Sequence, residues 1–235
     1  MQFENLLEGT LLRRYKRFLA DVELPGGQVI TAQCPKTGAM TGCAEPGSRV
    51  WLSTSASKTR KYPHTWELVE TTRGLACIHS AKANQVVYEA FAGGKIPGFE
   101  PYADISREVK YGQGSRIDLL LQGPSGRVYV EVKSVTLCRE GGWGAFPDAV
   151  SERGRKHVNE LRAMVASDTR ALLFFCVFHN GITGVSAAGD IDRRYRDALQ
   201  RAMAAGVEVL AWAASIDVEG LELSRPLPFA LDPSS

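Results

Sequence analysis

The sequence has no long apolar run and no basic leader. Its first eight residues contain Glu4 and Glu8 but neither Lys nor Arg, so they lack the basic start of a secretory signal peptide. No stretch approaches the roughly 20 apolar residues that a membrane-spanning helix needs. We therefore expect a cytoplasmic protein without a membrane partner.

Cysteine is sparse and shows no pairing pattern. The five cysteines are odd in number, scattered, and never in the Cys-x-x-Cys spacing of many zinc and redox sites. This favours reduced core or surface thiols over disulfides or zinc ligands. The five are Cys34, Cys43, Cys77, Cys138 and Cys176.

An excess of charge of one sign is also lacking. The chain has 28 Lys and Arg against 26 Asp and Glu, a formal net charge of +2. A nucleic-acid partner must therefore be argued from local clusters of cations. The apolar fraction of 44% is ordinary for a globular protein with a core, and 235 residues favour two domains over one.

The first third of the chain has short apolar segments separated by turn residues. Turn signals occur at Pro25-Gly26-Gly27, Pro46-Gly47 and Arg73-Gly74, and closely spaced short strands are typical of a small β barrel or sandwich. Five strands suit an OB-like barrel, which we assign to residues 1–81. The expected strands are 11–24, 28–33, 49–53, 66–70 and 76–80.

From residue 82 onward, strand and helix patterns alternate. Residues 81–92 carry apolar side chains at helical spacing and end at Gly93-Gly94. We therefore expect a second, α/β domain at residues 82–235, which makes the whole chain a two-domain α+β protein. Its expected elements are a helix at 81–92, a strand at 105–111, a hairpin at 115–135, a glycine-rich loop at 141–148, a helix at 151–166, a strand at 170–179, a helix at 193–205, a strand at 207–213 and a loose tail at 226–235.

The hairpin places three ionisable side chains among strand-forming apolar residues. Asp118 lies on its first strand, and Glu131 and Lys133, two residues apart, face the same side of its second strand. Two carboxylates close together in a poorly solvated place repel each other, and a divalent cation such as Mg²⁺, which takes oxygen ligands, relieves that repulsion. The alternative is a salt-bridged hairpin, with Glu131 paired to Lys133 and Asp118 exposed.

Cations gather in three groups along the sequence. Two of them have an aromatic residue inside, a combination that suits the phosphates and bases of single-stranded nucleic acid. The third occupies the first turns of the expected helix at 151–166, where cations oppose the helix dipole unless an anion binds nearby. The alternative is that these cations simply solvate exposed faces. The groups are Arg13, Arg14, Lys16 and Arg17; Lys58, Arg60 and Lys61; and Arg153, Arg155, Lys156 and His157.

Asp118 and the Glu131-Val132-Lys133 triplet resemble the D…ExK core of the PD-(D/E)xK nuclease superfamily. Longer motifs resemble the sugar fermentation stimulation protein family of bacteria and archaea, and the resemblance covers most of the chain. It implies an N-terminal OB-like barrel, a C-terminal nuclease-like domain, DNA binding and a regulatory role in sugar (maltose-type) catabolism. The motifs are Arg17-Phe-Leu-Ala-Asp-Val22, Thr37-Gly-Ala-Met40, Pro46-Gly47, Thr65-Trp-Glu-Leu68, Ser115-Arg-Ile-Asp118, Tyr129-Val-Glu-Val-Lys-Ser-Val-Thr-Leu137, Phe146-Pro-Asp-Ala149 and Arg153-Gly-Arg-Lys-His157.

The resemblance also implies supporting acids. In the nuclease superfamily the first helix often supplies a further acid to the metal centre, and Glu89 matches that role by position, although an exposed helix carboxylate is an equal alternative. Glu108 is a weaker candidate, and Asp148 lies in a family motif.

We predict a DNA-binding protein that is largely independent of sequence. The alternative is a nuclease in which Asp118 and Glu131 hold Mg²⁺ or Mn²⁺, Lys133 positions the attacking water and Glu89 supports them. A sugar-binding role is suggested by the family name alone. Whether the protein is an enzyme is left open, as are the strandedness of its target and its oligomeric state, for which a homodimer is one option.

Overall fold

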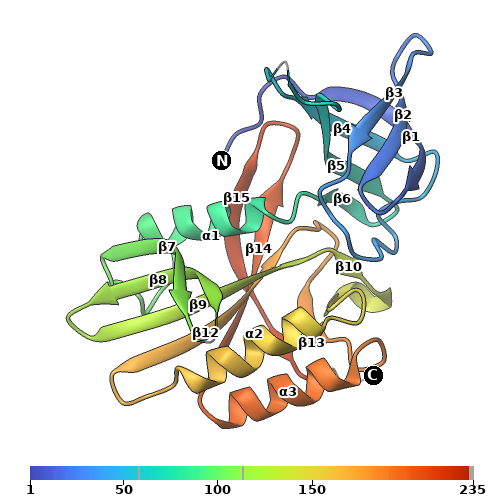
Figure 1. Cartoon of the computed structure of the whole chain (residues 1–235). Coiled ribbons are helices and arrows are strands. Elements are labelled where there is room, and N and C mark those ends of the chain that lie inside the picture. The colour runs from blue at the N-terminus through green and yellow to red at the C-terminus, as the bar shows by residue number, and fades with distance from the viewer. Residues whose placement is uncertain (58, 113, 233–235) are drawn as a thin grey trace.

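The N-terminal part of the chain is a closed β barrel (Figure 1). The computed structural model describes residues 1–57, 59–112 and 114–232. Strands follow the order β3-β2-β1-β4-β5-β6, and a parallel pairing of Gln33 with Thr65 joins β3 to β5 and closes the barrel. The predicted OB-like barrel is therefore confirmed. The strands are β1 (Leu7–Tyr15), β2 (Leu19–Glu23), β3 (Val29–Gln33), β4 (Arg49–Thr54), β5 (His64–Thr71) and β6 (Gly74–Cys77).

The single strand expected at residues 11–24 is wrong, because the chain reverses within it. Lys16 and Arg17 have φ angles of 50° and 65°, and they turn β1 back into β2. Hairpin turns of this kind need left-handed backbone conformations, which Asn and Gly usually supply. Lys and Arg give no such signal, so the turn was missed.

The C-terminal part is built on a six-stranded mixed sheet with helices on both faces (Figure 1). The order is β15-β14-β12-β9-β8-β7, with β12 at the centre and parallel to both β9 and β14. The predicted helices, hairpin and central strand are confirmed. The elements are α1 (Lys82–Ala92), β7 (Asp104–Tyr111), β8 (Ser115–Gly123), β9 (Gly126–Val135), α2 (Glu152–Ala163), β12 (Thr169–Val177), α3 (Arg193–Ala204), β14 (Glu208–Ile216) and β15 (Leu221–Leu227).

Two of the expected irregular segments carry strands. The glycine-rich loop contains β11, and the expected tail contains the end of β15 and all of β16, while residues 233–235 lie outside the described residues. A short strand rich in small residues lacks the apolar alternation that a sequence pattern can detect. A small second sheet, β10-β11-β13-β16, results. Its strands are β10 (Leu137–Cys138), β11 (Trp143–Phe146), β13 (Gly184–Ala187) and β16 (Phe229–Ala230), with a 3-10 turn at Glu140–Gly142.

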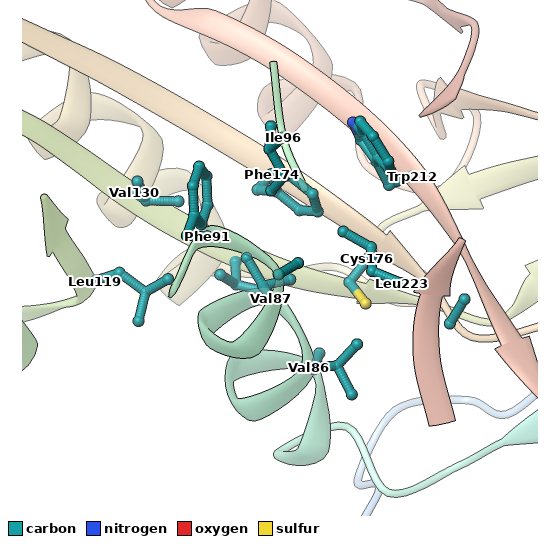
Figure 2. Close-up of a cluster of buried hydrophobic side chains, with 14 of the residues drawn as sticks. Val86, Val87, Phe91, Ile96, Leu119, Val130, Phe174, Cys176, Trp212 and Leu223 are labelled. Atoms are coloured by element: carbon teal, nitrogen blue, oxygen red, sulfur yellow. The ribbon is translucent and has the colours of Figure 1, made fainter. Parts of the chain in front are cut away.

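The two faces of the large sheet bury separate cores. On one face, Val87 and Phe91 of α1 pack with Val130 and Phe174, which are at most 8% exposed (Figure 2). On the other face, α2 and α3 cover a second cluster that includes Phe175. Burying each such side chain contributes about 1.5–3 kcal/mol. These cores hold β8 and β9 rigidly between α1 and α2.

The barrel packs directly against the C-terminal part of the chain, through a shared core and backbone hydrogen bonds. Trp51 and Leu68 of the barrel belong to the same buried cluster as α1. The Cys77 N–H donates to the Phe178 carbonyl at 3.0 Å, and the Asn180 N–H donates to the Leu75 carbonyl at 2.9 Å. The domain limits of 1–81 and 82–235 remain a prediction, although the architecture changes between β6 and α1.

Two expectations from the sequence concern membranes and thiols. Within the described residues, none of the helices combines the length and apolar character needed to cross a bilayer. All five cysteines are free, as predicted.

Candidate functional site

Regular pairing of β8 with both neighbours is broken around Asp118. The β8–β9 ladder runs from the turn to Leu119 and Val130 and stops there, one step before Asp118 would face Glu131. On the other side, the β7–β8 register omits Asp118 and Glu108, and Glu108 has a φ of 53°. Because the backbone at Asp118 is released from both ladders, its side chain can turn toward β9.

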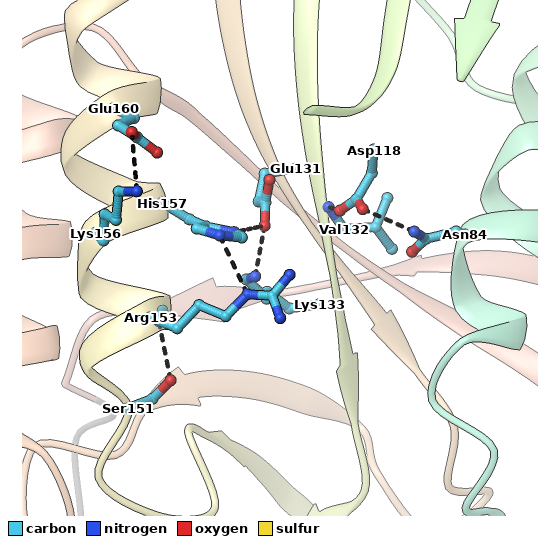
Figure 3. Close-up of polar contacts among 11 residues, drawn as sticks. Asn84, Asp118, Glu131, Val132, Lys133, Ser151, Arg153, Lys156, His157 and Glu160 are labelled. Atoms are coloured by element: carbon cyan, nitrogen blue, oxygen red, sulfur yellow. Dashed lines mark hydrogen bonds and ion pairs between the residues drawn. The ribbon is translucent and has the colours of Figure 1, made fainter. Parts of the chain in front are cut away.

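The Asp118 carboxylate accepts two hydrogen bonds, one on each oxygen (Figure 3). Asn84 of α1 donates its Nδ2 to Oδ1 at 2.7 Å, and the Val132 N–H donates to Oδ2 at 2.7 Å. Burial raises the pKa of the Asp118 carboxyl to about 6, and the charge of Glu131 adds to this rise. Asp118 therefore sits in a site that disfavours its charge, which an added cation would reverse.

Glu131 is held by two cationic or polar neighbours on one oxygen only. Glu131 is 1% exposed, and its Oε1 accepts from Lys133 Nζ at 2.6 Å and is in hydrogen-bond contact with His157 Nδ1. Burial by itself would raise the pKa of Glu131, but the His157 hydrogen bond and the Lys133 charge outweigh it and hold the pKa below its ordinary value. Among the described residues, its Oε2 is buried without a hydrogen-bond partner.

Helix α2 supplies His157 and Arg153 to this site (Figure 3). Ser151 caps the helix, since its Oγ accepts the Gly154 N–H at 3.0 Å. His157 is 8% exposed, and its Nε2 accepts a hydrogen bond from Arg153 Nε at 3.4 Å. Its place in the cation group at 153–157 predicts a phosphate contact for His157, but its ring lies against Glu131. The spacing of four between Arg153 and His157 was the available signal that they share a helix face.

Asp118, Glu131 and Lys133 are brought together, whereas Glu89 lies elsewhere. The Glu89 carboxylate accepts from the N-terminal amine of Met1 at 2.9 Å and from Gln85 at 2.8 Å. It comes five residues after Asn84, about 140° further around the helix. Thus α1 contributes an amide rather than an acid to Asp118. Sequence reasoning missed Asn84 because an amide on a helix carries no chemical signature.

The barrel's first cation group is partly committed to holding the barrel together. Arg13 pairs with Asp21 at 2.8 Å, and Arg14 donates to three backbone carbonyls, which include those of Lys36 and Gly38. Lys16 and Arg17 are exposed at the β1–β2 turn. These two side chains are therefore the better candidates for phosphate contacts.

The second and third groups show the same mixture. Arg60 donates to Gln33 and, at 3.3 Å, to Thr65, while the Lys61 ammonium lies 5.5 Å from the centre of the Tyr62 ring. Lys58 lies outside the described residues. On α2, Arg153 is exposed, Arg155 is half-buried and Lys156 pairs with Glu160 at 3.7 Å.

Asp148 joins the barrel to the other domain. Its carboxylate lies 3.4 Å from the buried ammonium of Lys36, which also donates to Thr136 Oγ1. Thr136 follows Lys133 by three residues on the chain. The contact fixes the barrel loop that carries Lys36 beside the end of β9.

The residues present fit a metal held by two carboxylates and completed by other oxygens. In the part of the chain that the structure describes, no three or more His, Cys, Asp or Glu residues form a ready-made cage. Mg²⁺ commonly uses only one or two carboxylates and keeps several waters. Glu131 Oε2 offers a free buried acceptor, and each Asp118 oxygen has a second lone pair.

The fold and site together define a two-part protein, an OB barrel docked on a mixed sheet that carries two neighbouring carboxylates, Glu131 buried and Asp118 half-buried. Two family models match this chain: "SfsA N-terminal OB domain" over residues 12–78 and "Sugar fermentation stimulation protein RE domain" over residues 81–220. The chain belongs to the sugar fermentation stimulation protein family.

Individual relatives cover nearly the whole chain. A sugar fermentation stimulation protein homolog of Marinomonas sp. (strain MWYL1) is 49% identical over 228 residues, which is 96% of this chain and 88% of that protein. A homolog from Pseudomonas paraeruginosa (strain DSM 24068 / PA7) is 50% identical over 235 residues, 98% of this chain and all of that protein. The solved structure of Pyrococcus furiosus SfsA in complex with Ca²⁺ has a TM-score of 0.88 at 25% identity and covers 98% of both chains.

Proposed function

We propose that the protein binds DNA largely through the sugar-phosphate backbone of the DNA. We propose further that it hydrolyses phosphodiester bonds at a site formed by Asp118, Glu131 and Lys133. The observation that carries this proposal is the buried Oε2 of Glu131, an acceptor without a hydrogen-bond partner in the described structure. A buried carboxylate oxygen in this position is expected to have a ligand. The raised pKa of Asp118 marks a second carboxylate that a cation would stabilise.

The metal proposed here is Mg²⁺ or Mn²⁺. It would be held by Asp118 and Glu131, and when bound it supplies a positive charge that stabilises the phosphoryl group and activates water. The Pyrococcus furiosus relative in complex with Ca²⁺ supports a divalent cation, since Ca²⁺ and Mg²⁺ both take oxygen ligands.

The chain's own residues would orient the reaction. Glu131 holds the Lys133 ammonium through Oε1 at 2.6 Å, which fixes Lys133 where it can position the attacking water and stabilise charge on the phosphate. Asn84 and the Val132 N–H fix the Asp118 carboxylate. Exposed cations at Lys16, Arg17 and Arg153 would contact backbone phosphates on either side.

DNA binding without cleavage is the second candidate. It is favoured by the Lys133–Glu131 ion pair, which already satisfies one oxygen of Glu131 without a metal. A role in regulating sugar catabolism has the family's name as its support, and no side chain at this site requires a sugar.

A cleavage assay separates the two candidates. Purified protein is incubated with supercoiled plasmid and with single-stranded DNA in Mg²⁺, Mn²⁺ or EDTA. We expect cleavage with metal only, and a loss of about 10²–10⁴-fold in Lys133→Ala, the range of a positioned proton-transfer group. Lys95→Ala, which removes a surface lysine paired with Glu222, is the matched control. DNA binding without cleavage under every metal condition would favour the binding protein.

A further inference from the structure

His157 is buried between two groups of opposite charge. Its Nδ1 contacts Glu131 Oε1, and its Nε2 contacts Arg153 Nε at 3.4 Å. A guanidinium can only donate hydrogen bonds, so Nε2 must accept and Nδ1 must carry the proton that it donates to Glu131. The two contacts therefore define one direction of donation, from Arg153 through His157 to Glu131.

This arrangement decides which Glu131 oxygen is available. With Oε1 occupied by His157 and Lys133, the free acceptor is Oε2. A glutamate carboxylate could otherwise rotate about the bond that joins it to the side chain and offer either oxygen. The contact with His157 removes that freedom before a ligand arrives.

The same contact also fixes Arg153. Its Nε lies 3.4 Å from His157 Nε2 (Figure 3), although the Arg153 residue itself is exposed. Holding the guanidinium through Nε leaves the four N–H groups on its two terminal nitrogens, which form the fork that suits a phosphate. An arginine held in this way loses less freedom on binding an anion than an untethered one.

We propose that His157 is a positioning residue that orients Glu131 toward the metal and Arg153 toward a DNA phosphate. It thereby fixes the position of the metal relative to that phosphate. The inference rests on the proposed function, because it assigns a metal to Glu131. A purely structural histidine would also be buried and hydrogen-bonded. The test must therefore remove the hydrogen bond of one ring nitrogen while keeping the hydrogen bond of the other.

Two substitutions make that separation. An asparagine amide occupies the place of Nδ1 and can donate to Glu131, but it is too short to reach Arg153. A glutamine carbonyl reaches the place of Nε2 and can accept from Arg153, but it leaves Glu131 without its donor. His157→Asn and His157→Gln thus each retain one of the two contacts.

Two affinities are measured on the full chain: Mn²⁺ binding by electron paramagnetic resonance, and binding of a DNA duplex in EDTA. We expect His157→Gln to lower Mn²⁺ affinity by about 10–100-fold, as for other partners of metal ligands, with metal-free DNA affinity close to wild type. We expect His157→Asn to retain Mn²⁺ affinity and to lose as much DNA affinity as Arg153→Ala. His179→Gln, at another buried histidine, controls for general loss of stability.

If each variant lowers Mn²⁺ affinity and DNA affinity together, or if neither variant changes either affinity, the inference is wrong. A purely structural histidine would not affect one affinity and spare the other. Binding of Mn²⁺ and DNA by the wild type without cleavage would overturn the proposed hydrolysis and leave this inference to be decided by the two affinities. A wild type that binds no Mn²⁺ would overturn the Glu131 half of it.

Discussion

At the scale of single residues, the site is a pair of carboxylates whose environments differ. Glu131 has its pKa lowered by His157 and Lys133 against the effect of burial, and Asp118 has its pKa raised to about 6, mainly by burial. Near neutral pH both are ionised, and below about pH 6 Asp118 takes up a proton. A cation at this site therefore competes with a proton at Asp118.

That competition gives a pH dependence. Because the pKa of Asp118 in the folded protein lies near 6, its protonated form predominates below that pH and a metal must displace the proton. We expect apparent Mn²⁺ affinity to fall by about tenfold per pH unit below pH 6 and to level off above it. Titrations between pH 5 and 8 in calorimetry check this, with Asp118→Asn as the comparison. An affinity equally flat in both proteins would remove Asp118 as a ligand.

Removing the Asp118 carboxylate should weaken Mn²⁺ binding but should not weaken DNA binding in the absence of metal. In EDTA, Asp118→Ala should bind DNA as well as the wild type or more tightly, because one negative charge near the phosphate is gone. Fluorescence anisotropy with a labelled duplex measures this. A clear loss of metal-free affinity in a folded Asp118→Ala protein would count against phosphate binding at this site.

Part of this site could be predicted from the sequence. Asp118, Glu131 and Lys133 were identifiable because ionisable residues interrupt apolar strands, and strand alternation relates Glu131 to Lys133. His157 and Asn84 could not be assigned, because a helix pattern does not say which neighbour lies opposite each face. Glu89 was selected by position along a helix, and the same uncertainty about the facing element explains why it lies with Met1 instead.

At the scale of elements, helix α2 is fixed at its start by two linked caps. Ser151 Oγ caps α2, and Asp192 caps α3 through the Tyr195 N–H at 2.9 Å. Asp192 also accepts the Ser151 N–H at 2.9 Å and is 4% exposed. One carboxylate therefore ties the beginnings of both helices, and through α2 it supports His157.

The caps give a stability prediction. Ser151→Ala should lower the free energy of unfolding by about 1 kcal/mol, because the Gly154 N–H loses its acceptor. Asp192→Ala should lower it by more, since it removes the α3 cap and leaves the Ser151 N–H unsatisfied. Urea denaturation monitored by circular dichroism measures both. Equal effects of the two substitutions would contradict the shared role of Asp192.

The elements that were predicted correctly share a strong local pattern. β12 is a continuous apolar run, α2 has a serine cap and an apolar stripe, and the hairpin has a turn rich in glycine. The seven-residue strand β15 was also missed, and the other missed strands, β10, β11, β13 and β16, are two to four residues long and are set by tertiary pairing. Segments of that length hold too little periodicity to be recognised.

At the scale of the whole molecule, exposed cations lie on both the barrel and α2. The Lys36 contacts with Thr136 and Asp148, together with the shared core, hold the barrel against the sheet. A ligand that touches the β1–β2 turn and the carboxylate site would therefore meet a fixed surface. The sequence predicted both parts, but docking depends on contacts between distant residues that local patterns do not encode.

The salt dependence of DNA binding tests the cations of the barrel. Lys16→Gln combined with Arg17→Gln should weaken binding to all duplex sequences and make the slope of log affinity against log salt shallower by about 2, roughly 0.9 per lost phosphate contact. Arg193→Gln with Arg201→Gln on α3, at the opposite end of the molecule from the barrel (Figure 1), is the matched control. An unchanged slope, or a loss confined to one sequence, would contradict backbone binding by this turn.

Anomalous X-ray diffraction from crystals of the protein grown with Mn²⁺ shows whether Asp118 and Glu131 together hold a divalent cation. We expect an anomalous peak within bonding distance of Glu131 Oε2 and of an Asp118 carboxylate oxygen, with His157 and Lys133 still on Glu131 Oε1. A Mn²⁺ peak at another group, with Glu131 Oε2 left without a ligand, would show that these two carboxylates do not form the metal site.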